Sequence, residues 1–283
     1  MVPIDVNDRD ALVAALLPAV CEAGRLEMAH FTNGVTFEQK ADRSPVTAAD
    51  REAEAVILAA LGGIAPDVPV VAEEDVAGGA ACRYAKRFFL VDALDGTRLF
   101  IRGKPEFSIN IGLVEDGRTK FGLIYLPPYE RLFVTRAGGA YEVRLPIGGD
   151  VQYADLPFKR LQTRTPDPDA LVAFNSRGAG AASTNLLTLL KVHEAKPLGS
   201  SMKFCLIAAG EGDLYARFGE TCEWDTAAGQ AILEAAGGSV TNLDGTPLTY
   251  GHYDRVFRNP YFVAWGRQPL WRGAVAELPA AGA

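Results

Sequence analysis

The segment RFFLVDALDGT, residues 87–97, restricts the fold of this chain more than any other stretch. Its four consecutive apolar residues, Phe88 to Val91, predict a buried strand. Asp92 ends this strand, and Asp95 follows three residues later. Buried strands tend to present the residues at their carboxyl ends to a functional site, so we expect both carboxylates to face one.

Two carboxylates so close in the chain repel each other unless a cation or protons lie between them. Hard carboxylate oxygens, together with a backbone carbonyl and a hydroxyl, suit Mg²⁺ and do not suit zinc. The amides of Gly96 and Thr97 come directly after the Asp-Gly turn. If they open a short helix, they point at a phosphate, because the first amides of a helix lack internal partners. The pattern D-x-x-D-G-T therefore predicts a magnesium and phosphate site.

The same four letters, Leu-Asp-Gly-Thr, return at residues 243–246, but their surroundings differ. They lie between two short strand-like pieces, and Pro247 suits the start of an edge strand. Thr241, three positions before the aspartate, offers no carboxylate. We expect this second copy to be a hairpin turn without a chemical role.

Acidic residues also mark the ends of other predicted elements. Glu73 is the first of three acids after the apolar strand VPVVA, and Asp225 precedes the helical segment TAAGQAILEAAGG. Asp50 lies in the first turn of a helix that begins at Thr47. Each of these acids alone is an ordinary surface or helix-start residue. The histidines of the chain are isolated from one another, which argues against a histidine-based metal site: His30, His193 and His252.

The first half of the chain predicts two helices followed by antiparallel strands. Apolar residues recur at helical spacing over residues 8–32. A polar loop follows, and the capping-box pattern T-A-A-D begins a second helix at Thr47, which we expect to end at Gly62 and Gly63. Strand and turn signals alternate over residues 108–143, which is typical of an antiparallel meander.

The second half alternates strands and helices, which is typical of an α/β arrangement. Its predicted strands are LVAFNS and DLYARFG, and its predicted helices are SMKFCLIAAGEG and WDTAAGQAILEAAGG. The polar, proline-containing stretch near residues 150–170 is the best candidate for a boundary. We therefore expect an N-terminal α+β subdomain with the metal-binding loops over residues 1–155, and a C-terminal α/β subdomain with the specificity elements over residues 156–283.

Charge and cysteine usage exclude several classes of protein. The net charge of −7 gives no general attraction to nucleic acid polymers or anionic lipid. The four cysteines are widely spaced without a C-x-x-C pair, which argues against a zinc ribbon or disulfide framework and fits a reducing compartment: Cys21, Cys82, Cys205 and Cys222. An acidic N-terminus and the lack of a long apolar run predict a cytoplasmic protein. The sequence does not decide between a monomer and a homodimer. It also leaves open whether the protein attaches peripherally to the cytoplasmic face of the inner membrane.

Five blocks of the sequence resemble the lithium-sensitive, magnesium-dependent phosphatases of the inositol monophosphatase superfamily. They occur in the family's order: SPVTAAD (44–50), AEED (72–75), VDALDGT (91–97), GSSMKFCLIAAGEGDLYARFG (199–219) and WDTAAGQAILEAAGG (224–238). Within the family, the forms S-P-V-T-A-A-D, G-S-S-x-K-F-C-L and Y-x-R-F-G look most like the bacterial 3'(2'),5'-bisphosphate nucleotidases of the CysQ type. The resemblance implies a layered αβαβα sandwich of the inositol monophosphatase and fructose-1,6-bisphosphatase type, with a metal site between its halves.

The resemblance also implies a role for individual residues. Glu73, Asp92 and the Leu94 carbonyl match the ligands of a first Mg²⁺. Asp92, Asp95 and Asp225 match those of a second, and a third, weaker ion would also touch Glu73. The Thr97 hydroxyl, paired with Asp50, would orient the attacking water, which makes these two residues catalytic together with Glu73. The implied substrate contacts are Gly96, Thr97, Ser200, Lys203, Arg217 and Asp225.

Arg217 carries the expected choice of substrate. Inositol monophosphatases tend to have an acid at this position, whereas a guanidinium favours a second phosphate, which it binds bidentately. The alternative for Arg217 is a solvated charge on a strand. Lys40, in the polar loop before SPVTAAD, either closes over the site or is an exposed lysine.

Two departures from the family pattern bear on this expectation. Ala93 stands where proline is usual, and we expect a less rigid metal loop because proline would fix φ near −65°. Gly178 and Ala179 follow Ser176 and Arg177, where related nucleotidases commonly have S-R-S-H, so the usual histidine contact to the nucleotide is missing.

The leading hypothesis is a Mg²⁺-dependent phosphatase that removes the 3'-phosphate of adenosine 3',5'-bisphosphate, and that also acts on 3'-phosphoadenylyl sulfate if the pocket admits it. The alternative enzyme is an inositol or sugar monophosphatase with the same metal site. A third hypothesis, a catalytically inactive regulatory protein that binds a metal or nucleotide, conflicts with the retention of every acidic ligand position.

Overall fold

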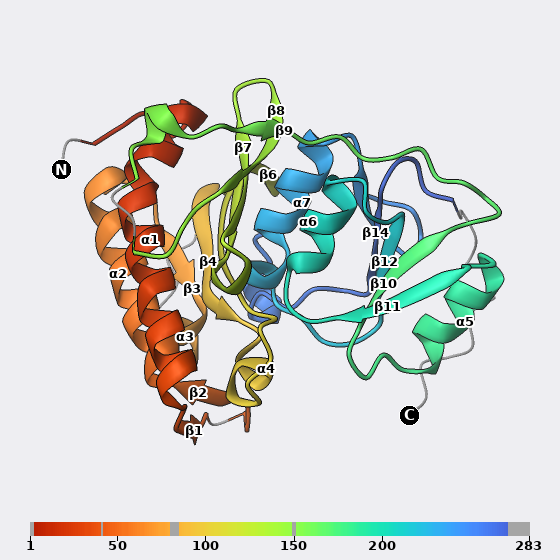
Figure 1. Cartoon of the computed structure of the whole chain (residues 1–283), viewed down its shortest axis with the longest axis horizontal. Helices are drawn as coiled ribbons and strands as arrows, with labels where there is room; N and C mark the ends of the chain where they lie inside the picture. The colour runs from red at the N-terminus through yellow and green to blue at the C-terminus, as the bar shows by residue number, and fades with distance from the viewer. Residues whose placement is uncertain (1–2, 41, 80–84, 149–150, 271–283) are drawn as a thin grey trace.

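The computed structural model describes residues 3–40, 42–79, 85–148 and 151–270. Helices and sheets form five successive layers in the order αβαβα (Figure 1). This arrangement confirms the fold class expected from the resemblance. Cys82 lies outside the described residues, and the other three cysteines are free thiols.

Helices α1 (Arg9–Asn33) and α2 (Ala48–Ile64) form the first layer. Both helices were expected, and Thr47 caps the second as its capping box predicts, while Asp8 caps the first. The expected end of α2 at Gly62 and Gly63 is wrong, since the helix continues to Ile64, whose side chain is fully buried. Burial of this residue outweighs the weak helix propensity of two glycines.

The second layer is a seven-stranded sheet with strands in chain order. Strand β3 is parallel to β4, and the later neighbours are antiparallel, which confirms the predicted meander. The strands are β3 (Val70–Ala72), β4 (Arg87–Asp95), β5 (Ser108–Glu115), β6 (Arg118–Leu126), β7 (Arg131–Arg136), β8 (Gly139–Arg144) and β9 (Lys159–Arg160). Because β9 pairs with β8, the chain keeps contact with this sheet beyond residue 155; the division at that residue remains a prediction.

The apolar run in β4 is continuous because helices cover both faces of this sheet. Phe88 and Leu90 pack toward the middle helical layer, whereas Phe89 and Val91 pack toward α1 and α2. All four side chains are at most 1% exposed. The strand therefore reaches the site from the centre of the core.

Helices α6 (Met202–Ala208) and α7 (Ala227–Ala235) form the middle layer between the two sheets (Figure 1). Helix α7 approaches β5 and β6 at two glycines. A Cβ atom at Gly122 would lie 2.2 Å from the Ala228 carbonyl oxygen, and one at Gly112 would lie 2.9 Å from the Ala227 Cβ. Only glycine allows this contact, which brings the start of α7 to the end of β4.

The fourth layer is a five-stranded sheet in the order β11-β10-β12-β14-β13, and α5 (Ala181–Leu189) covers its outer face (Figure 1). Its strands are β10 (Val172–Ser176), β11 (Glu194–Leu198), β12 (Leu214–Arg217), β13 (Ser239–Asn242) and β14 (Phe262–Trp265). The second Leu-Asp-Gly-Thr copy is a turn after β13. There the Gly245 amide bonds the Asn242 carbonyl, and Thr241 forms an isolated bridge with Pro247.

The remaining elements are short. The loop expected before Thr47 contains a small hairpin, β1 (Phe37–Gln39) and β2 (Pro45–Thr47), so the expectation of an unstructured polar loop is wrong there. The others are α3 (Glu73–Ala77), α4 (Thr97–Ile101) and the 3₁₀ turns η1 (Pro127–Tyr129), η2 (Tyr153–Asp155), η3 (Glu223–Asp225) and η4 (Tyr253–Arg255).

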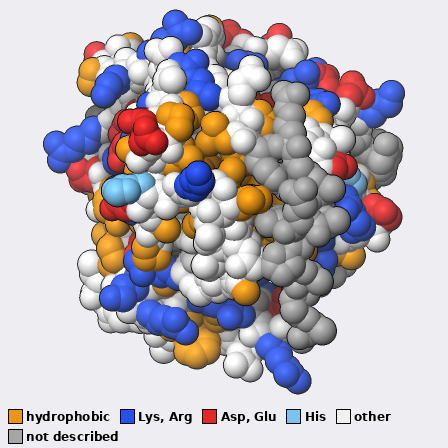
Figure 2. Space-filling model, turned by 90° about the vertical axis from the view of Figure 1, so that its right-hand side faces the viewer, with side chains coloured by type: hydrophobic (Ala, Val, Ile, Leu, Met, Phe, Trp, Pro, Cys, Tyr) orange, Lys and Arg blue, Asp and Glu red, His pale blue; other side chains and the backbone are white. Residues whose placement is uncertain are grey.

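Figure 2 shows the face of the molecule on the side of α5 and the five-stranded sheet. On this face, basic, acidic and apolar side chains are mixed. Among the described residues, no helix combines the length and the apolar character needed to cross a bilayer.

Candidate active site

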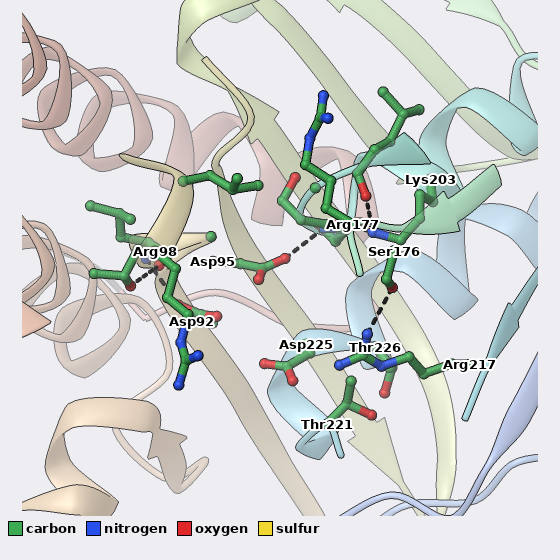
Figure 3. A pocket seen from close by; sticks show the side chains of 18 of the residues that line it. Asp92, Asp95, Arg98, Ser176, Arg177, Lys203, Arg217, Thr221, Asp225 and Thr226 are labelled. Carbon is green, nitrogen blue, oxygen red and sulfur yellow. Dashed lines mark hydrogen bonds between the residues drawn. The ribbon is translucent and has the colours of Figure 1, made fainter. Parts of the chain in front are cut away.

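A bulge at the end of β4 brings Asp92 and Asp95 to the same side of the sheet. Asp92 pairs with Asn110 and Asp95 pairs with Ser108, so three steps along β4 match two steps along β5. Residues three apart on a regular strand point to opposite faces, and one extra residue reverses this relation. Both carboxylates therefore point into one cavity, where Figure 3 shows them.

Gly96 turns the chain directly from β4 into α4. Its φ of +101° is in the region that favours glycine, and a Cβ atom there would lie 2.6 Å from the Glu106 carbonyl oxygen. The turn places Thr97 at the first position of α4. The expected short helix after the Asp-Gly turn is thus present.

Asp50 is held by the capping box that the sequence predicts. Its Oδ2 accepts hydrogen bonds from the Thr47 amide at 2.8 Å and from the Thr47 hydroxyl at 2.6 Å. Its Oδ1 accepts a hydrogen bond from the Thr97 hydroxyl at 2.8 Å. Asp50 is 3% exposed, and burial raises the pKa of its carboxyl group. Asp50 therefore takes part in the cap of α2 and also pairs with Thr97.

Glu73 is the first residue of α3, directly after β3. A residue that the sequence did not single out, Glu54 of α2, fixes this helix by accepting the amides of Glu74 at 2.9 Å and Asp75 at 3.1 Å. Lys40 donates to the Glu73 carboxylate at 2.7 Å and also contacts Glu74. The Lys40 side chain is only 9% exposed, so the alternative of a freely exposed lysine is wrong.

Asp225 lies in η3, immediately before α7. Its Oδ2 accepts the Cys222 amide at 2.8 Å, which fixes the side chain in this turn. The contact of α7 with Gly112 and Gly122 therefore places Asp225 opposite the end of β4.

The structure brings the predicted acidic residues into one neighbourhood. Carboxylate oxygens of Glu73, Asp92 and Asp225 lie within 4.8 Å of one another. Asp95 lines the same cavity, and its charge raises the pKa values of Asp92 and Asp225. Burial is the main reason that the pKa values of Asp92, Asp95 and Asp225 are all raised.

Such a cluster fits a divalent cation. Its donors are carboxylate oxygens, and the Leu94 residue between the two aspartates also lines the cavity. Hard oxygen donors suit Mg²⁺, and mutual repulsion of the acids would be relieved by positive charge between them. The Leu94 amide donates a hydrogen bond to Asp92 Oδ1 at 3.0 Å. This side-chain contact closes the turn at residues 92–94, in which Ala93 stands where proline is usual.

The cavity has a volume of about 440 Å³ and lies between the two sheets. Asp92 and Asp95 of the first half lie on one side, and Asp225 lies on the other with Lys203 and Arg217 of the second half (Figure 3). The predicted substrate residues Ser200, Lys203 and Arg217 all belong to this lining, as do Gly96 and Thr97. Among the predicted site residues, only Asp50 lies behind the lining, where it contacts Thr97.

Lys203 reaches the cavity from α6. Its ammonium group donates to the carbonyl oxygens of Ser200 at 2.5 Å and Leu198 at 3.3 Å, and lies 4.8 Å from the Tyr215 ring centre. Burial lowers the pKa of Lys203 to about 8, while Asp95 acts in the opposite direction. Ser200 has a φ of +48°, a strained value for serine.

Arg217 lies at the end of β12 with its guanidinium group in the cavity wall (Figure 3). It donates to the Ser176 hydroxyl at 2.7 Å and to the Glu220 carbonyl at 2.7 Å. Among the described residues, no carboxylate forms an ion pair with Arg217. Its guanidinium group lines the cavity, and its contact with a substrate stays a prediction.

Two further residues at the cavity were not predicted. Glu106, 6% exposed, lies behind the lining and accepts Arg177 Nε at 2.8 Å and the Gly199 amide at 2.7 Å. It thereby joins the loop between α4 and β5 to the segment before α6. Arg98 of α4 borders the cavity on the side of Asp92 (Figure 3). Glu106 has no local sequence signal, since both of its partners are far away in the chain.

Comparison with known proteins agrees with this geometry. Residues 8–274 match the inositol monophosphatase family. The 3'(2'),5'-bisphosphate nucleotidase CysQ of Escherichia coli K12 is 37% identical over 253 residues, which cover 87% of this chain and 98% of that protein. CysQ of Buchnera aphidicola is 33% identical, with 88% and 93% covered.

Solved structures give the same result. CysQ from Bacteroides thetaiotaomicron, a bacterial member of the inositol monophosphatase family, has a TM-score of 0.74 and 31% identity, with 92% of this chain and 98% of that chain covered. An inositol monophosphatase from Anabaena has a TM-score of 0.69 and 26% identity, with 91% of each chain covered.

Proposed function

The chain belongs to the inositol monophosphatase family, and on that basis we propose that it is a Mg²⁺-dependent phosphatase that removes the 3'-phosphate of adenosine 3',5'-bisphosphate. The observation that carries this proposal is the meeting of Glu73, Asp92 and Asp225, from three separate segments, in one cavity with Arg217, which has no carboxylate partner in the part of the chain that the structure describes. The CysQ relatives are named for the same activity.

We assign the cation ligands to the residues that the sequence predicts. Glu73, Asp92 and the Leu94 carbonyl would hold one Mg²⁺, and Asp92, Asp95 and Asp225 would hold a second. When bound, two such ions lower the pKa of a bound water and offset the negative charge that otherwise blocks attack on a phosphate monoester. The chain's own contribution is to hold these ligands rigidly through the bulge, the α3 cap and the η3 turn.

Thr97 and Asp50 would direct the attacking water. A threonine hydroxyl has one hydrogen to donate, and Thr97 donates it in a hydrogen bond to Asp50, so its oxygen can accept a hydrogen bond from a water molecule. The buried Asp50 carboxylate is held on both oxygens and stays in place. The amides of Gly96 and Thr97, at the start of α4, would then bind the phosphoryl oxygens.

Arg217, Lys203 and Ser200 would bind the second phosphate or the nucleoside. Arg217 is fixed by Ser176 and Glu220, which leaves its planar guanidinium group oriented for a phosphate. Gly178 and Ala179, where a histidine contact is usual, lie outside the cavity lining. The nucleoside would therefore be held with fewer side-chain contacts than in nucleotidases that have the histidine.

The decisive experiment measures phosphate release from adenosine 3',5'-bisphosphate, 3'-phosphoadenylyl sulfate, inositol 1-phosphate and fructose 1,6-bisphosphate, each with Mg²⁺ and with a chelator. We expect the two 3'-phosphorylated nucleotides to have the highest kcat/KM, and the chelator to abolish turnover. A preference for inositol 1-phosphate would replace the proposal with the monophosphatase alternative. Turnover that is unchanged by the chelator would reject the metal assignment.

A further inference from the structure

Three buried polar side chains lie next to one another at the cavity, Ser201 in its lining and Ser108 and Asn110 behind it, and the proposed mechanism uses none of them. Ser108 and Asn110 are 0% exposed and Ser201 is 2% exposed. Burial of polar groups costs free energy unless each finds a partner. Their contacts therefore indicate what this cluster holds in place.

Asn110 lies on the strand next to the metal loop. It is directly opposite Asp92 in the antiparallel pair of β4 and β5. Residues in such a pair project their side chains to the same face of the sheet. The Asn110 amide is therefore on the face that carries the acidic cluster.

Two hydroxyl groups fix the orientation of this amide. The Ser201 hydroxyl donates to Asn110 Oδ1 at 2.6 Å, and the Ser108 hydroxyl donates to it at 3.1 Å. The Nδ2 group has no hydrogen-bond partner within the described chain. The hydrogen bonds of the Asn110 side chain therefore run through Oδ1 to the two serines.

Ser201 links this cluster to Asp95. Its backbone amide donates to Asp95 Oδ2 at 2.5 Å, while its hydroxyl bonds Asn110. Ser201 also precedes α6, which carries Lys203, and it follows Ser200 in the cavity wall. One residue thus connects an acidic ligand position with the segment that contacts the substrate.

We propose that Asn110 is a positioning residue that orients Ser201, and that Ser201 in turn fixes the Asp95 carboxylate and couples it to the segment 199–203. This coupling makes the binding of Mg²⁺ and the binding of phosphate strengthen each other. The inference rests on the proposed role of Asp95 as a metal ligand. A purely structural role of the cluster would stabilise the fold without changing the affinity for either ligand.

The test is calorimetric titration of the full chain with Mg²⁺, with and without inorganic phosphate. In the natural protein we expect phosphate to tighten Mg²⁺ binding by about fivefold or more. Asn110→Ala should weaken Mg²⁺ binding by about tenfold or more and remove the effect of phosphate, because groups that orient metal ligands commonly contribute that much. In kinetics, the Mg²⁺ concentration for half-maximal rate should rise much more than kcat falls.

Ser108→Ala is the matched control. It removes a buried hydroxyl that bonds Asn110 and Ser201 and makes no hydrogen bond to Asp95. It should lower the melting temperature and leave Mg²⁺ affinity within about twofold of the natural protein, since Asn110 keeps its bond to Ser201. If Asn110→Ala does not fold, Asn110→Leu carries the test, because its side chain is of similar size and cannot accept the hydrogen bond from Ser201.

Natural Mg²⁺ affinity and intact coupling in a folded Asn110 variant would overturn this inference and leave the proposed function standing. Failure of the natural protein to bind Mg²⁺ would overturn both.

Discussion

The Thr97 hydroxyl donates a hydrogen bond to Asp50 Oδ1 at 2.8 Å, although the two residues are 47 positions apart in the chain. Asp50 lies in the first turn of α2, and Thr97 begins the short helix α4. The contact joins the two segments whose sequences give the clearest local signals. It also leaves the Thr97 oxygen able to accept a hydrogen bond from water.

The first prediction concerns this pair. Thr97→Val preserves the shape of the side chain and removes the hydroxyl, so kcat should fall by about 10²–10⁴, the usual contribution of a positioned acid or base. Mg²⁺ affinity should change by less than about threefold, because no carboxylate ligand is altered. Steady-state kinetics and metal titration check both parts. Thr97→Ser, which keeps the hydroxyl, should retain most of the activity; comparable kcat values for the valine and natural enzymes would refute the water-orienting role.

The second prediction compares the two copies of Leu-Asp-Gly-Thr. Asp95→Asn should abolish Mg²⁺-dependent turnover and the rise in melting temperature that Mg²⁺ produces, while the metal-free protein stays folded. Replacing one of several repelling buried acids should leave the metal-free form as stable as before or more stable by ~1 kcal/mol. Thermal melts with Mg²⁺ and with chelator measure this.

Asp244→Asn is the matched control for that prediction, because it makes the same change in the same tetrapeptide at an exposed turn. It should leave activity and the Mg²⁺ effect unchanged. Full turnover in Asp95→Asn would remove the two-metal assignment.

The third prediction concerns the second phosphate. Arg217→Ala should lower kcat/KM for adenosine 3',5'-bisphosphate by about 100-fold, because a charge-assisted, bidentate contact is lost. Turnover of a simple monophosphate should fall by less than about threefold. Arg217→Lys should lie between the two, since a lysine keeps the charge but not the planar pair of donors. Equal losses on both substrates would show that Arg217 does not select the bisphosphate.

Local signals predicted those parts of the structure that depend on neighbouring residues. The capping box at Thr47, the buried strand β4 and the tight turn at Gly96 each follow from a few adjacent side chains. The difference between the two Asp-Gly turns also followed from their flanking residues. The metal-ligand roles of Glu73 and Asp225 came from the family resemblance, because an acid after a strand or before a helix has no distinctive local pattern.

The parts that the sequence did not predict depend on contacts between distant segments. The bulge between Asp92 and Asp95 is defined only by its register against β5. Glu106 accepts a hydrogen bond from the Gly199 amide, which is 93 positions away, and Glu54 of α2 accepts one from an amide in the first turn of α3. The hairpin in the polar loop before Thr47 was missed because it buries few apolar residues and has only short strands.

The last prediction concerns Glu27, a carboxyl group in α1 that the mechanism does not use. Glu27 is 0% exposed, and neither of its carboxyl oxygens has a hydrogen-bond partner within the described chain. Burial, and then the nearby charge of Asp50, raises its pKa well above the usual value of 4.5. The folded protein therefore keeps Glu27 protonated at a pH at which the unfolded chain has lost that proton.

The sign of the effect follows from this difference. The raised pKa of Glu27 contributes to the free energy of unfolding. This contribution is fully present below about pH 4.5 and is lost as the pH rises toward the raised pKa of the folded state. Glu27→Gln removes this titration, so the variant should gain stability relative to the natural protein by up to about 1.4 kcal/mol per pH unit above pH 5. Urea unfolding of the chelated proteins at pH 5, 6, 7 and 8 measures the gain. Glu22→Gln, on the same helix, removes an exposed acid paired with Arg25 whose pKa is lowered, and its effect should stay constant over this range. A pH-independent difference between Glu27→Gln and the natural protein would mean that Glu27 is already ionised in the folded state.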